Sequence, residues 1–178
     1  SARVAKGEYR NMRTVVTNAL VYAVIAGLLA MNILFFGAGA FERLYDRPGL
    51  EMPLRVLAPT TFIVALLGVF RGYFQGHGDM VPTSISQILE QIVNAGISVF
   101  ATWQFLKIYE DSDQAASFGA AGGTFGTLAG AAAALLFMGF LFMSASVQYQ
   151  GQLNPNEKLE SGKYINKALF LTIIPIIL

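Results

Sequence analysis

The chain has 178 residues, of which 54% are hydrophobic and 13% are charged, whereas a soluble domain carries about 25% charged residues. This composition argues against a water-soluble globular enzyme, and a net charge of +1 offers no basic surface for binding nucleic acid. The chain has no cysteine and one histidine, so neither a disulfide framework nor a zinc site is expected.

Long uncharged segments predict membrane-spanning helices, because a span needs roughly 20 apolar residues at about 1.5 Å each. The predicted fold is an all-α, polytopic transmembrane helix bundle with about four full spans plus the start of a fifth. The approximate spans are 14–41, 52–71, 82–107, 117–147 and 165–178. Since the chain begins without Met and ends inside an apolar run, we expect a piece of a longer protein.

The charges of the loops predict the orientation of the bundle. Segment 1–13 carries four basic residues and one acidic residue, whereas the loop 42–51 carries three acidic and two basic residues. By the positive-inside rule, segment 1–13 is cytoplasmic. Alternation then places 71–80 and 148–167 inside and 107–117 outside.

The second span contains a proline and ends at an arginine. Pro59 lies within 52–71, and its missing N–H predicts a kink. The span is just long enough if the Arg55 side chain reaches back to the interface. Arg71, at the cytoplasmic end, is either an ordinary stop charge or an anchor for phosphate groups.

The third span carries one acidic residue within the membrane. Glu90 lies on roughly the same face as Gln87, Asn94 and Ser98, so a polar stripe follows the helix. Such a carboxylate either lines a cavity or pairs with a structural cation, and the stripe fits a cavity or interhelical hydrogen bonds. The candidate substrate or cavity residues are Glu90, Gln87, Asn94, Ser98, Arg71 and Arg55.

The fourth span contains small residues at every fourth position. Gly122, Gly126 and Gly130 form this ladder, which predicts a groove where another helix approaches closely. His77 is a candidate catalytic base or metal ligand, but no nucleophile or second ligand accompanies it. The simpler interpretation is that it belongs to a tight turn. We expect no catalytic residue, no metal and no cofactor, although a coupling ion is left open.

Three motifs resemble one transporter family. Residues 54–59 read LRVLAP, residues 71–76 read RGYFQG and residues 80–91 read MVPTSISQILEQ. These runs closely resemble the MurJ/SpoVB-type polysaccharide and lipid II flippases of the multidrug/oligosaccharidyl-lipid/polysaccharide exporter superfamily. Residues 7–13 and the Gly/Ala-rich fourth span agree more loosely.

The resemblance implies a MATE-like fold of two six-helix lobes, with this chain as a partial N-terminal lobe. It implies a membrane flippase that moves a lipid-linked oligosaccharide or a lipid II-like peptidoglycan precursor across the bacterial cytoplasmic membrane by alternating access. The implied partners are a lipid-linked sugar pyrophosphate, membrane lipids and the remaining helices of the transporter.

The sequence leaves three alternatives to this flippase open. One is a multidrug or other polysaccharide-lipid exporter of the same superfamily. Another is the membrane part of an enzyme acting on lipid-linked substrates, which should show acidic pairs or a His-rich loop. The third is a non-catalytic packing module of a cell-envelope enzyme complex, which should lack polar groups at depth such as Glu90 and Asn94.

Overall fold

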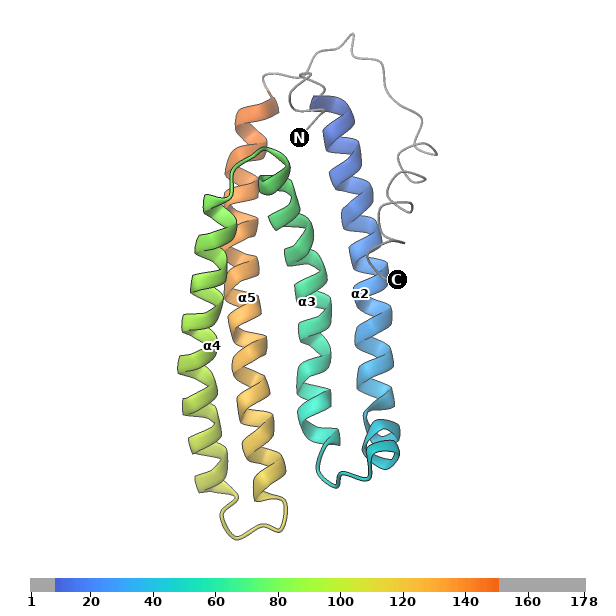
Figure 1. Ribbon diagram of the computed structural model, residues 1–178, viewed down its shortest axis with the longest axis vertical. Helices are drawn as coiled ribbons and strands as arrows, with labels where there is room; N and C mark the ends of the chain where they lie inside the picture. Colours follow the sequence, from blue (N-terminus) through green and yellow to red (C-terminus); the bar gives the residue numbers. More distant parts are fainter. Residues whose placement is uncertain (1–8, 151–178) are drawn as a thin grey trace.

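All secondary-structure elements in the described part of the chain are α-helices. The computed structural model describes residues 9–150, and the side chains of residues 12–145 within them. The helices, labelled as in Figure 1, are α2 Tyr9–Tyr45, α3 Glu51–Gly76, α4 Val81–Ile108 and α5 Ala115–Gln150. The predicted all-α bundle is confirmed here, while the predicted fifth span, 165–178, lies outside the described residues.

Every helix extends beyond the span expected from its sequence. The longest, α2, has 37 residues, which at about 1.5 Å each is well over the roughly 30 Å of a hydrocarbon core. Most of the expected limits lie where charges interrupt the apolar run, and those of the span 117–147 follow its apolar centre. A charge ends the apolar segment but not the helix, because helical hydrogen bonds continue into the interface.

Among residues 9–150, three helices are long and apolar enough to cross a membrane, namely α2, α3 and α5. The chain is therefore a multi-pass membrane protein of helical type. Helix α4 is not among the three, although it has 28 residues. Its polar side chains at Gln87, Glu90, Gln91 and Asn94 lower its hydropathy.

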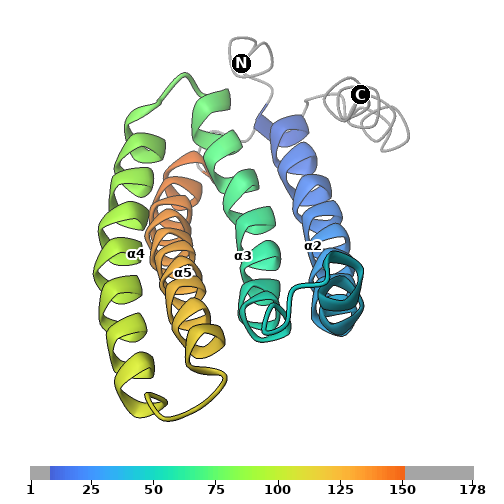
Figure 2. The same cartoon turned by 60° about the horizontal axis from the view of Figure 1, so that its bottom comes forward.

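The four helices lie side by side in the order α4, α5, α3, α2 (Figures 1 and 2). Helix α5 packs against both α4 and α3, and α3 also packs against α2. This arrangement leaves broad flanks uncovered, so large apolar side chains are exposed, such as Phe36 at 79% and Leu136 at 75%. Lipid or further helices must cover these side chains, because exposure of such a large apolar surface to water is unfavourable.

The most buried cluster lies where α3 and α5 approach their C-terminal ends. Leu67 and Tyr73 of α3 pack with Ala134 and Met138 of α5. The ring of Tyr73 also meets that of Phe142 edge to face, with centroids 4.8 Å apart. This cluster fixes α5 against α3 at the end of the bundle that the loop charges predict to be cytoplasmic.

Pro59 lies inside α3, and the helix continues through it from Glu51 to Gly76. The Thr61 hydroxyl donates a 2.7 Å hydrogen bond to the carbonyl of Ala58. Proline lacks the N–H that would bond the carbonyl four residues earlier. The predicted kink stays a prediction.

Cysteine labelling tests the orientation. The α3–α4 turn, which contains Gly78, lies at one end of the bundle, and the loops that contain Asp46 and Asp113 lie at the other (Figure 1). We expect Gly78→Cys to react with a membrane-impermeant reagent only from inside, and Asp46→Cys and Asp113→Cys only from outside. Reaction of Gly78→Cys from outside contradicts the orientation. The matching sites Lys6 and Glu157 lie outside the described residues.

Candidate functional site

An ion pair joins α3 to α4 inside the membrane spans 52–71 and 82–107 that the sequence predicts. Arg71 Nη2 donates to Glu90 Oε2 at 2.7 Å, and the two side chains are 18% and 20% exposed. Glu90 lies about 14 Å along α4 from its first residue. An isolated charge at such a depth is costly, so each partner stabilises the other.

Arg71 makes a second contact on α4. Its Nε donates to Ser86 Oγ at 2.9 Å, and the Ser86 hydroxyl donates to the carbonyl of Thr83 at 2.7 Å. Ser86 is fully buried. The guanidinium thus uses two of its donors in a fixed geometry on one helix face, which a lysine could not reproduce. The sequence analysis missed Ser86, although its position four residues before Glu90 places both on one face.

Asn94 and Ser98 belong to the contact between α4 and α5. Ser98 Oγ lies 2.9 Å from Asn94 Oδ1 and 2.8 Å from the carbonyl oxygen of Gly123 on α5. Thr102, one turn further, donates to the carbonyl of Gly119 at 3.2 Å. Interhelical hydrogen bonding therefore accounts for this half of the polar stripe.

The glycine ladder of α5 lies against the backbone of α4. A Cβ added at Gly122 would lie 2.7 Å from Thr102 N, and one at Gly126 would lie 2.5 Å from Ser98 N. One at Gly130 would lie 2.6 Å from the carbonyl oxygen of Glu90. The absence of side chains at the ladder lets the two helices approach closely enough for the hydrogen bonds of Ser98 and Thr102 to form.

Gln87 and Arg55, the remaining two candidates, make no ion pair or hydrogen bond with Arg71 or Glu90 in the described part of the chain. Gln87 is exposed on α4. Arg55 lies about 24 Å from Arg71 along α3 and pairs there with Glu51. Its side chain is 52% exposed, and its guanidinium lies 5.8 Å from the centre of the Phe35 ring. Arg55 therefore does not share a site with Glu90 in this structure.

His77 follows α3 and packs with the aromatic side chains at its end. Its Nδ1 lies 2.8 Å from the carbonyl oxygen of Tyr73, and the two rings are 4.4 Å apart. These contacts fit the tight-turn interpretation. Within residues 9–150, no cluster of three or more His, Asp or Glu side chains could hold a metal ion.

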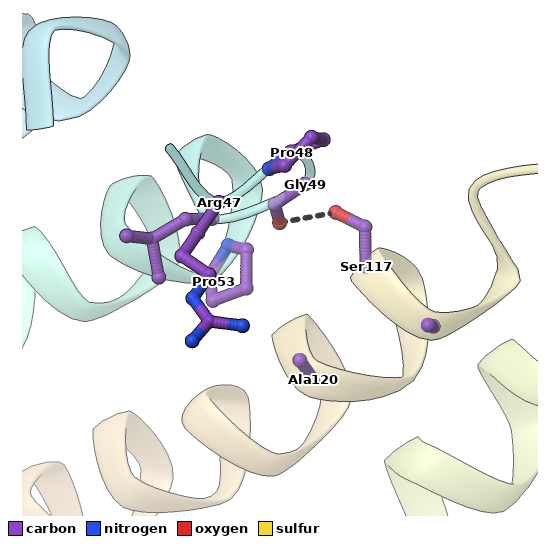
Figure 3. Close-up of a pocket in the computed structure, with 8 residues that line it drawn as sticks. Arg47, Pro48, Gly49, Pro53, Ser117 and Ala120 are labelled. Atoms are coloured by element: carbon purple, nitrogen blue, oxygen red, sulfur yellow. Dashed lines mark hydrogen bonds between the residues drawn. The ribbon is translucent and has the colours of Figure 1, made fainter. Parts of the chain in front are cut away.

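A shallow pocket of about 300 Å³ lies at the opposite end of the bundle (Figure 3). The α2–α3 loop and the start of α5 form its walls, with Arg47, Pro53 and Ala120 among the lining residues. The Ser117 hydroxyl donates to the carbonyl of Gly49 at 2.7 Å. Gly49 has φ of +88°, which favours glycine, so the pocket wall is a close turn held to α5.

The chain matches one family model over almost its whole length. The model is described as "Polysaccharide biosynthesis protein" and covers residues 2–173. Among curated proteins of Bacillus subtilis (strain 168), "Lipid II flippase MurJ" is 30% identical over 59% of this chain and 21% of the relative. "Stage V sporulation protein B" is 29% identical over 75% of the chain and 25% of the relative.

A third relative from the same organism, "Uncharacterized membrane protein YabM", is 25% identical over 94% of the chain and 30% of the relative. The chain thus spans between about a fifth and a third of the length of these relatives. No solved structure gives a significant match.

Proposed function

Because the chain belongs to the family of polysaccharide biosynthesis proteins, we propose that it is part of a membrane flippase for a lipid-linked saccharide. The substrate we propose is a lipid-linked oligosaccharide or a lipid II-like peptidoglycan precursor, moved across the cytoplasmic membrane. The name "Lipid II flippase" of one relative supports this substrate class. The chain accordingly belongs with transporters and not with enzymes.

The observation that carries the proposal is the partly exposed ion pair between two predicted membrane spans. Arg71 and Glu90 are paired, yet each keeps about a fifth of its side chain accessible. A purely structural module has no need for charges there, whereas a transporter for a charged and hydroxylated head group does. The pair also lies beside an uncovered flank of the bundle, where further helices of a longer protein can enclose a cavity.

The mechanism we propose is alternating access by lobes that rock about a central cavity. In this scheme the four helices α2 to α5 correspond to the third to sixth helices of an N-terminal six-helix lobe. The sugar pyrophosphate crosses in the cavity while the lipid tail stays in the bilayer, so no covalent step is required. The close α4–α5 contact supports movement of these two helices as one body.

A vesicle assay tests the function directly. The full-length protein is reconstituted and given a polyprenyl-pyrophosphate-linked disaccharide in one leaflet, and its appearance in the other leaflet is measured. We expect transfer well above that of protein-free vesicles. Transfer of an unrelated amphiphilic cation in place of this lipid supports a multidrug exporter, and no transfer of either supports a packing module.

Glu90→Gln tests whether the charge of the pair contributes to transport. The amide keeps the shape and can still accept a hydrogen bond from Arg71, so we expect normal expression and folding, with a smaller loss of stability than for Glu90→Met. Transport should fall, because the guanidinium then lacks its countercharge. The readouts are complementation of a flippase-depleted strain and thermal unfolding of the purified variant. Normal complementation would mean that transport does not need the charge of Glu90. A loss of stability with transport intact would mean that Glu90 has a structural role only.

A further inference from the structure

Two exposed glutamines on α4, Gln87 and Gln91, fall inside the membrane span 82–107 that the sequence predicts. Gln87 and Gln91 lie about 9 Å and 15 Å along α4 from Val81. Both are exposed, and neither has a hydrogen-bond partner in the part of the chain that the structure describes. An amide surrounded by hydrocarbon leaves its donors and acceptors unsatisfied, so this flank requires water, protein or a polar ligand.

Helix α5 covers the part of this α4 flank that lies beyond the glutamines. Along α4, the flank of Asn94 and Ser98 is covered by α5 at Gly130 and Gly126. Beyond Gly130, Ala134 and Met138 of α5 are buried against Leu67 and Tyr73 of α3. The continuation of the same α4 flank, from Asn94 toward the predicted cytoplasmic end, is exposed at Gln87 and Gln91.

The neighbouring flank of α4 is exposed but apolar. Ile88 and Ile92 are 61% and 66% exposed, and each follows one of the glutamines by one residue. One residue turns a helix by about 100°, so the isoleucines form a separate, apolar flank. The amide flank adjoins Glu90, which lies between Gln87 and Gln91 in sequence and pairs with Arg71.

We propose that the exposed amides of Gln87 and Gln91 line the water-filled path and hydrogen-bond the hydroxyl groups of the saccharide being transported. The inference rests on the proposed flippase function and assigns the saccharide part of its substrate to this flank. Each amide offers two donors and one acceptor oxygen, a set that matches sugar hydroxyls. Positions four residues apart lie about 6 Å from each other on one helix flank, a spacing that lets both amides reach one sugar unit.

Single cysteines test whether the flank faces water. The 178 residues contain no cysteine, so each variant introduces the single cysteine of this segment. We compare Gln87→Cys, Gln91→Cys, Ile88→Cys and Ile92→Cys in the full-length protein, with all cysteines outside the segment replaced by serine. A membrane-impermeant thiol reagent is expected to label the two glutamine positions and to leave the two isoleucine positions unlabelled. Absence of labelling at both glutamine positions means that protein covers them, and this overturns the proposal.

Protection by substrate tests the saccharide assignment. A polyprenyl-pyrophosphate-linked disaccharide at about ten times its dissociation constant should slow labelling of Gln91→Cys about tenfold, because few sites stay vacant. The matching polyprenyl pyrophosphate without sugar should slow it much less. Equal protection by both lipids overturns the sugar contact. Transport by the parent protein is measured with the same lipid, so failure of this contact is distinguished from failure of the flippase function.

Discussion

Replacing Gly126 by alanine is expected to lower the free energy of unfolding by about 3 kcal/mol, the upper part of the range for overpacked cores. The added Cβ would lie 2.5 Å from Ser98 N, which is backbone and cannot rotate away. Helices α4 and α5 must then separate, and the hydrogen bond from Ser98 to the carbonyl of Gly123 is lost with them. Thermal unfolding in detergent measures the effect.

Gly139→Ala is the matched control on the same helix. A Cβ at Gly139 meets nothing within 4 Å in the described part of the chain. Since alanine is favoured over glycine by up to about 1 kcal/mol in a helix interior, this variant should be neutral or stabilising. The two substitutions thus have opposite expected signs. Equal melting temperatures for both variants contradict the close α4–α5 contact.

Replacing Arg71 by methionine is expected to cost about 2–3 kcal/mol, less than for a fully buried pair because a fifth of each side chain stays accessible. The substitution leaves the Glu90 carboxylate unpaired and removes the donor to Ser86. Glu90→Met should cost a similar amount, since it leaves the guanidinium unpaired. Both values come from thermal or denaturant unfolding of the purified variants.

The double variant separates pairing from packing. With both charges replaced by apolar side chains, no buried charge is left over, so the double variant should lose less stability than the sum of the two single variants. Arg55→Met is the control, because its pair with Glu51 is 52% and 39% exposed and should contribute less than about 1 kcal/mol. Additive losses at Arg71 and Glu90 contradict the ion pair.

The sequence by itself determined the positions of the helices, and its glycine spacing indicated one close contact between them. Uncharged runs bounded by charges predicted four helices, because backbone hydrogen bonds in lipid must be satisfied within each span. The four-residue spacing of Gly122, Gly126 and Gly130 indicated a close helix contact without naming the partner. Periodicity also placed Glu90 on a polar face, because side chains four residues apart share a helix face.

Only the tertiary structure decided which partner each polar residue has. Helical periodicity groups Gln87, Glu90, Asn94 and Ser98 on roughly one face, but it does not say what lies against that face. In the structure, α5 covers Asn94 and Ser98, Glu90 pairs with Arg71 of α3, and Gln87 is exposed. The crossing of helices depends on contacts between segments far apart in the chain, and local sequence patterns do not contain that information.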